Sequence, residues 1–317
     1  MEKTKCFRGA LAVFLVVSAW TFSAWAVDYP TKPITVLVPY APGGASDIMT
    51  RALATALEPL LGQPIAVSNK PGATGATMMT QLAHSKPDGY TIGNTPGSLA
   101  VTPYLQQVPY DIAKDFTYLV ALNTYMDAFT VRTDSPWKTL KDLMDYARQN
   151  PKKLRVGMSG LGGSTTVMTK FVSQQAAAEV TMIPFKGDGE VVTALLGDHI
   201  EVGCNNGAQI SHVRAGTLRM LALALSERVS DFPDVPTFKE LGYDFVTLSL
   251  SGMAGPKGMP EAIVQKLIDA LVKAREDRVY LETIRKLYLH PQNEIGKDFE
   301  KRIVEIHRRM GEYSKLK

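Results

Sequence analysis

Short apolar segments that alternate with amphipathic segments constrain the fold of this chain more than any other feature. Residues 34–40 are typical of a buried strand, and residues 47–61 carry apolar side chains at near-helical spacing. A second strand over 65–68, a helix over 77–85 and a third strand over 90–93 follow. Because such a β-α-β-α-β run joins parallel strands through helices, it predicts a parallel sheet with helices on both faces.

The same alternation restarts further along the chain. It predicts a helix over 140–149, followed by strands and helices over 154–158, 165–178, 180–184, 191–196 and 200–204. We therefore predict an α/β protein of two β/α domains, with a first part of domain 1 over 27–124, domain 2 over 125–247, and a return to domain 1 with C-terminal helices over 248–317. Two crossings between domains make a hinge with a ligand cleft between them.

The first 26 residues are typical of a secretory signal peptide. Lys3, Lys5 and Arg8 precede an apolar run over 10–19, and the segment ends at Ala24-Trp25-Ala26. The alternative is an uncleaved membrane anchor, but the apolar run is shorter than the ~20 residues that a spanning helix needs. We expect cleavage after Ala26 and a periplasmic mature protein.

Charge and cysteine content exclude several classes of protein. The chain has 35 Lys and Arg against 31 Asp and Glu, a balance too even for an electrostatic nucleic-acid binder. Cys204 is the only cysteine that remains once the signal peptide is removed, so no internal disulfide can form. Cys204 is expected to be a small buried apolar residue.

The sequence offers no assembled catalytic or metal-binding machinery. None of the histidines lies at metal-ligand spacing to another histidine or to Cys204; they are His84, His199, His212, His290 and His307. Residues 160–163 resemble a fragment of a dinucleotide-binding turn, but position 165 is Thr rather than Gly or Ala. We predict no catalytic residue, no metal site and no cofactor.

Gly-rich turns that follow a strand and precede a helix are the main functional signal. Two lie in each predicted domain, over 41–47, 70–75, 159–166 and 186–189. Glycine permits close approach of a ligand to the backbone, and a helix start offers unpaired N–H groups and a positive dipole end. Such turns favour an anion such as a carboxylate. The alternative is that Ser46, Thr74 and Ser164 merely cap their helices.

Eight short segments, in this order, resemble those of the Bug-type periplasmic receptors of tripartite tricarboxylate transporters. They are residues 29–34, 38–44, 69–73, 87–91, 183–187, 215–219, 233–237 and 252–258. The resemblance implies a type II periplasmic-binding-protein fold. It also implies that backbone N–H groups and hydroxyls, rather than an arginine clamp, capture a small carboxylate.

The predicted ligand-binding residues lie in the four turns and at two strand ends. They are Tyr40, Pro42, Gly43, Gly44, Ser46, Asp47, Ala73, Thr74, Gly75, Ser159, Gly162, Gly163, Ser164, Thr165, Thr166, Lys186, Gly187, Asp188 and Asn205.

These observations predict a non-enzymatic receptor for a small organic carboxylate, either a di- or tricarboxylate or an aromatic acid. We expect a monomer that hands its ligand to the permease subunits of a membrane transporter. Two alternatives stay open from the sequence: a sensory module for a signalling partner, and a secreted hydrolase on the same fold class.

Overall fold

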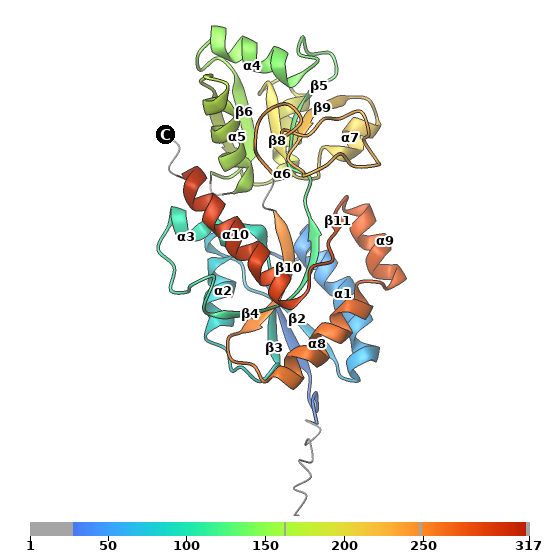
Figure 1. The fold of residues 1–317 in the computed structure, drawn as a ribbon. Coiled ribbons are helices and arrows are strands. Elements are labelled where there is room, and N and C mark those ends of the chain that lie inside the picture. The colour runs from blue at the N-terminus through green and yellow to red at the C-terminus, as the bar shows by residue number, and fades with distance from the viewer. Residues whose placement is uncertain (1–27, 162, 247–248, 315–317) are drawn as a thin grey trace, which may run out of the picture.

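A computed structural model describes residues 28–161, 163–246 and 249–314 of the 317-residue chain. Two β-sheets with their covering helices form two lobes, one above the other in Figure 1. The predicted signal peptide and the crossing predicted near residue 247 fall outside the described residues. Within the described ranges no helix has the length and apolar character needed to cross a membrane.

The first lobe is built on a six-stranded sheet in the order β11-β4-β10-β3-β1-β2. The strands are β1 (Ile34–Val38), β2 (Ile65–Asn69), β3 (Thr91–Thr95), β4 (Phe116–Thr124), β10 (Leu250–Pro256) and β11 (His290–Pro291). Strand β1 runs parallel to β2 and β3, whereas β10 lies antiparallel between β3 and β4. The carboxyl ends of β1, β3 and β4 therefore meet at one edge of the sheet.

Helices cover both faces of this first sheet. They are α1 (Ala45–Leu61), η1 (Ala73–Gly75), α2 (Ala76–Ala83), η2 (Gly97–Ala100), α3 (Thr102–Leu105), α8 (Glu261–Ala274), α9 (Arg278–Lys286) and α10 (Gly296–Ser314). On one face Leu53 and Leu57 of α1 share a core with Leu267 and Leu271 of α8. Helices α2 and α10 belong to the core on the other face.

The second lobe holds a five-stranded sheet in the order β7-β6-β8-β5-β9. Its strands are β5 (Ala128–Arg132), β6 (Arg155–Ser159), β7 (Thr181–Phe185), β8 (Val202–Asn205) and β9 (Leu218–Leu223), and its helices are α4 (Leu140–Gln149), α5 (Ser164–Gln175), α6 (Asp188–Leu196) and α7 (Ile210–Arg214). Strand β6 runs parallel to β7 and β8. The carboxyl ends of these three strands also meet at one edge.

The two lobes are connected by adjacent chain segments. Strand β4 ends at Thr124 in the first sheet, and β5 begins at Ala128 in the second. Strand β10 starts the return to the first sheet and pairs Leu250 with Thr124. The α/β fold class with two joined β/α lobes, predicted from the sequence, is therefore confirmed, while the boundaries at 124 and 247 stay predictions.

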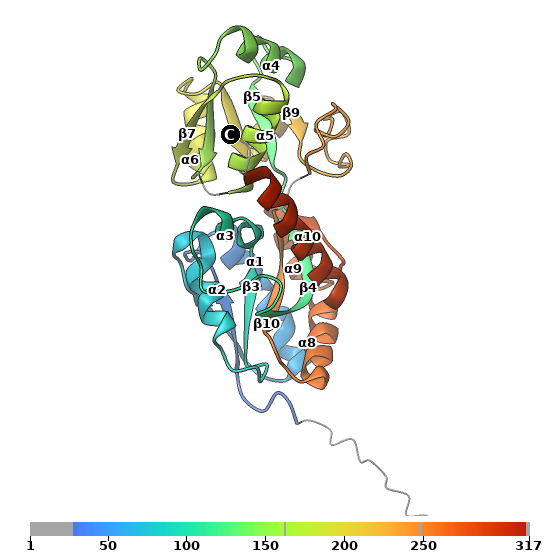
Figure 2. The same ribbon diagram turned by 60° about the vertical axis from the view of Figure 1, so that its left-hand side comes forward.

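Helix α10 contacts both lobes. Its Phe299 packs edge-on against Tyr118 of β4, with ring centres 5.4 Å apart. At its other end Tyr313 contacts Phe171 of α5 and Phe245, with ring centres 4.9 and 5.3 Å apart. Figure 2 shows α10 running along the first lobe up to the second. The C-terminal segment thus ties the lobes together in addition to returning to the first sheet.

Candidate functional site

A cleft of about 550 Å³ lies between the two lobes, at the carboxyl ends of strands from both sheets. This edge is where open α/β sheets place their ligands. Residues from the first lobe, from both connecting segments and from the second lobe line it together. Its position between hinged lobes allows a bound molecule to be enclosed from two sides.

The turn before α1 is braced by its own side chains. Gly43 has a φ of 83°, a conformation that glycine adopts without strain, and its N–H donates to Asp47 Oδ2 over 2.9 Å. Asn69 Nδ2 donates to Asp47 Oδ1 over 2.9 Å, and Arg51 forms an ion pair with the same carboxylate. Burial alone would raise the pKa of Asp47, but the hydrogen bonds from Arg51, Gly43 and Asn69 hold it below its ordinary value.

The N-terminus of α1 faces the cleft without a side-chain cap. Its N-cap is Gly44, in extended conformation, and no side chain accepts from the first N–H groups. Ser46 does not cap the helix; its hydroxyl lies 3.3 Å from that of Tyr125, in the first connecting segment. Burial raises the pKa of Tyr125 to about 12, so this phenol stays protonated. The first lobe thus presents uncapped backbone donors and a hydroxyl pair.

The N-terminus of α5 faces the same cleft from the second lobe. Its N-cap is Gly163, again with no side-chain cap. Thr166 lies behind this turn and donates from Oγ1 to the carbonyl of Gly160 over 3.2 Å. The Ser164 hydroxyl donates to Asp127, and its oxygen accepts from no N–H group of the first turn of α5. The capping alternative is therefore wrong for Ser46 and Ser164, whose helices have glycine as the N-cap residue, while the side chain of Thr74 lies outside what the structure describes.

The turn before α6 places an acidic side chain, that of Asp188, in the lining of the cleft. Gly187 is the N-cap, and Asp188, the first helical residue, accepts from Asn205 Nδ2 and from the N–H of Ala208, both over 2.9 Å. Burial raises the pKa of Asp188 above its ordinary value, against the lowering effect of these donors. Lys186 is exposed, and within the part of the chain that the structure describes it is the only cationic side chain lining the cleft.

The structure brings about half of the predicted site residues to the cleft wall. These residues are Tyr40, Gly44, Ser46, Ser159, Gly163, Ser164, Thr165, Lys186, Gly187 and Asp188. Others support the turns or lie apart from the wall: Pro42, Gly43, Asp47, Ala73, Gly75, Thr166 and Asn205. Gly162 and the side chain of Thr74 lie outside what the structure describes.

Several residues that line the cleft were not predicted from the sequence. They are Ala45, Pro96, Gly97, Tyr125, Gly160, Leu161, Asn206 and Ser249. Pro96-Gly97 follow β3 and carry the same strand-end signal as the predicted turns, so they could have been found. Tyr125 and Ser249 belong to the two connecting segments, which carry no turn motif.

Cys204 is a buried residue of the second sheet. Cys204 is fully buried in β8, where burial raises the pKa of its thiol well above the ordinary value, so its prediction as a small buried residue is confirmed. Across residues 28–161, 163–246 and 249–314, no three His, Cys, Asp or Glu side chains gather closely enough to hold a metal ion.

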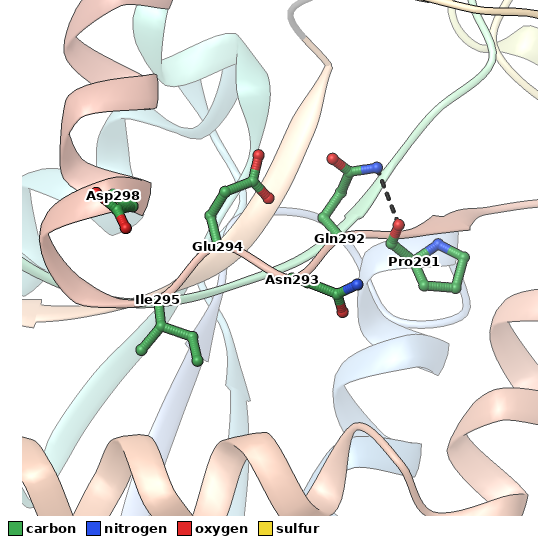
Figure 3. Close-up of a pocket in the computed structure, with 6 residues that line it drawn as sticks. All are labelled: Pro291, Gln292, Asn293, Glu294, Ile295 and Asp298. Carbon is green, nitrogen blue, oxygen red and sulfur yellow. Dashed lines mark hydrogen bonds between the residues drawn. The ribbon is translucent and has the colours of Figure 1, made fainter.

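A second hollow, of about 520 Å³, lies outside the cleft (Figure 3). A single segment around the start of α10 lines it, with Pro291, Gln292, Asn293, Glu294, Ile295 and Asp298. Gln292 donates to the carbonyl of Pro291 over 2.9 Å, and Glu294 pairs with Arg302 over 2.6 Å. Because one lobe supplies the whole lining, lobe closure cannot enclose a molecule there.

Two α/β lobes, adjacent connecting segments and a cleft at the strand ends define a periplasmic-binding-protein fold. A TctC solute-binding protein from Polaromonas shares it with a TM-score of 0.81 and 30% identity, over 90% of this chain and 98% of that one. MatC from Rhodopseudomonas palustris with bound malate has a TM-score of 0.77 and 27% identity, over 90% and 100% of the two chains. Rpa4515 of R. palustris with adipate has a TM-score of 0.79 and 26% identity, over 91% and 98%.

Sequence comparison identifies the family. Residues 49–315 match the model of the tripartite tricarboxylate transporter family receptor. The UPF0065 protein in the gbd 5′ region of Cupriavidus necator is 35% identical over 282 residues, which cover 89% of this chain and 86% of that protein. This chain belongs to the tripartite tricarboxylate transporter receptor family, a family of solute-binding proteins. The predicted Bug-type resemblance is confirmed.

Proposed function

We propose that this protein is a periplasmic receptor that captures a small organic carboxylate, a di- or tricarboxylate or an aromatic acid. It hands this ligand to the permease subunits of a tripartite tricarboxylate-type transporter. The observation that carries the proposal is a pair of helix starts on opposite lobes of one cleft. Their N-cap residues, Gly44 of α1 and Gly163 of α5, have no side chain that could accept from the first N–H groups. Uncapped N–H groups and two positive dipole ends directed at one space favour an anion.

The makeup of the cleft supports binding rather than turnover. Ser164 and Asp127 lie within hydrogen-bond distance, but no histidine is among the described residues that line the cleft to act as a base. Two structural relatives hold the aliphatic dicarboxylates malate and adipate. The basic, apolar and Ala-x-Ala pattern of residues 1–26 supports export.

Ligand titration of the protein recovered from the periplasm of expressing cells tests the proposal. Thermal unfolding is followed with di- and tricarboxylates, aromatic acids and matched neutral amides. A carboxylate at a hundredfold excess over its dissociation constant should stabilise the fold by ~2.7 kcal/mol. The amides should not stabilise it. Absence of stabilisation by every carboxylate contradicts the proposal, and release of a product from the bound acid would favour a hydrolase instead.

The same preparation tests export and assembly. Mass spectrometry should give a mature N-terminus at Val27, and light scattering should give the mass of one chain. Co-purification with the membrane permease should increase when the ligand is present, because the closed form is the one that carries it.

A further inference from the structure

The first lobe also contacts the second at a corner formed by residues 287–290, from the end of α9 to the start of β11. The half-buried ring of Tyr288 packs there against the apolar cluster of the second lobe that contains Met220 and Leu223 of β9. The guanidinium of Arg214, in α7, lies over the same ring, 5.1 Å from its centre. In Figure 1 this corner lies below α7. One aromatic side chain of the first lobe is thus held by the second.

The corner and the cleft lie on opposite sides of the strands that connect the lobes. In the first sheet β4 and β10 carry the chain to and from the second lobe, and β11 lies beside β4, whereas β3 and β1 lie beyond β10. The cleft residues Gly44 and Pro96 follow β1 and β3. In the second sheet β9 lies on one side of β5, while β6 and β7, whose following turns line the cleft, lie on the other. Tyr288 therefore reaches β9 on the side away from the cleft.

Rotation of the lobes about the connecting strands moves these two sides in opposite directions. A rotation that narrows the cleft around a ligand widens the gap at the corner, because hinge closure pivots on the segments between the lobes. It draws the ring of Tyr288 away from Arg214 and from the apolar cluster at β9. Contacts that are lost on closure favour the arrangement with the wider cleft.

The backbone at Tyr288 has a conformation that glycine normally occupies. Tyr288 follows Leu287, the C-cap of α9, and its φ of 55° lies in the left-handed region. Helices often end with glycine at this position, because a residue with a Cβ is strained there. The N–H groups of Tyr288 and Leu289 donate to carbonyls in the last turn of α9, so the helix ends without help from the ring. The contacts with the second lobe are therefore what a tyrosine adds at this position.

Resting on the proposed function, in which a ligand closes the lobes, we propose that Tyr288 and Arg214 set ligand affinity from outside the cleft. Their contact is present when the cleft is wide and is broken when it closes, so part of the free energy of ligand binding is used to separate them. Tyr288 lies outside the lining of the cleft. It is a positioning residue, which acts on the relative placement of the lobes.

Replacement of Tyr288 by glycine tests the proposal on the full exported protein. The Tyr288→Gly variant keeps a residue that suits the backbone and loses the ring. Isothermal titration calorimetry is carried out with malate, adipate, succinate, citrate and benzoate. Every acid that binds the wild type should bind the variant more tightly, by about three- to thirtyfold, because a cation–π contact no longer opposes closure. A residue that only stabilised the fold would leave the affinity unchanged or weaken it.

Three further variants separate the ring contact from other effects. Tyr288→Phe keeps a ring over Arg214 and should bind within about twofold of the wild type. Arg214→Met removes the guanidinium and should also bind more tightly, which decides the matter if Tyr288→Gly does not fold; the ion pair of Arg214 with Asp231 is half exposed, so its loss costs little stability. Lys152→Gly is the matched control, because Lys152 has a left-handed φ of 61° in an exposed turn between α4 and β6. Its affinity should not change.

Failure of this proposal is distinct from failure of the proposed function. Unchanged or weaker affinity in folded Tyr288→Gly or Arg214→Met overturns the proposal and leaves a carboxylate receptor. A gain of the same size in Tyr288→Phe or in Lys152→Gly also overturns it, because the ring contact would then not be the cause. Absence of binding of all five acids to the wild type contradicts the proposed function instead.

Discussion

The starts of α1 and α5 both face the cleft and both have glycine as the N-cap residue, but different hydrogen bonds stabilise them. The turn before α1 is braced from within its own lobe, by Asp47 with Gly43, Arg51 and Asn69. The start of α5 is fastened instead to the connecting segments, through Ser164 with Asp127 and Ser249. The first turn is stabilised by residues of its own lobe, whereas the second helix start is bonded to the connecting segments.

This difference assigns separate roles to the lobes. We expect the turn before α1, in which Arg51 pairs with Asp47, to keep its shape whether the lobes are open or closed. A helix start bonded to both connecting segments changes its surroundings when those segments bend. We therefore expect a ligand bound at α5 to favour one hinge geometry over another, which is how a ligand shifts a two-state equilibrium.

The largest expected effect is that of Gly44→Val on ligand binding. The φ of Gly44 is −77°, which valine adopts, and an added Cβ would meet only Ala41 O at an ordinary 3.5 Å. The fold should persist while the side chain obstructs the N–H groups of α1, with a loss of affinity of about a hundredfold or more in calorimetry. Gly189→Val, in open space off the cleft wall, is the matched control. Unchanged affinity in folded Gly44→Val would remove the first lobe from the site.

Asp47→Asn should destabilise the fold by about 2 kcal/mol, because charged hydrogen bonds to Gly43, Arg51 and Asn69 are lost. Urea unfolding measures this loss. Ser164→Ala, at the other helix start, should cost less stability because its hydroxyl braces no turn of its own lobe. An equal or larger loss for Ser164→Ala would reverse the proposed contrast.

A pH dependence follows from the same carboxylate. The pKa of Asp47 is lowered in the folded protein, so its contribution to stability is complete above its ordinary pKa of about 4 and disappears as the pH falls through the lower folded value. The gap in free energy of unfolding between the wild type and Asp47→Asn should be constant above about pH 5 and narrow below about pH 4. A gap that widens as the pH falls would show that the carboxylate is not stabilised in the fold.

Much of the fold could be predicted because its parallel strands are short, apolar and followed by glycine turns. Helix α1 was expected over 47–61 and extends over Ala45–Leu61, and β6 was expected over 154–158 and extends over Arg155–Ser159. Strand β4 was missed, since Phe116–Thr124 is buried along most of its length and lacks a following glycine turn.

The turns of the site could be predicted from the sequence. Which of their residues line the cleft and which stabilise the turns could not. Glycine turns mark a possible anion cradle locally, and ten of the predicted residues reach the wall. Whether Asp47 meets a ligand or braces the turn depends on Asn69, 22 residues further along the chain. The hydrogen bond from Ser164 to Asp127 joins residues 37 positions apart, and no local sequence pattern predicts it.

The smallest expected effect is that of Tyr125→Phe. This change removes one hydroxyl of the pair with Ser46, at 3.3 Å, and leaves the backbone donors of α1 in place. Affinity for a carboxylate should fall about threefold, within the range of one neutral hydrogen bond. A loss of more than about a hundredfold would show that the phenol, rather than the backbone donors of α1, supplies most of the binding in the first lobe.

A crystal structure with the tightest-binding acid tests the central claim most directly. We expect ligand oxygens within about 2.7–3.2 Å of N–H groups at the starts of both α1 and α5, with the lobes closed on them. A ligand held by one lobe alone, or in the surface hollow around Glu294, would contradict the account.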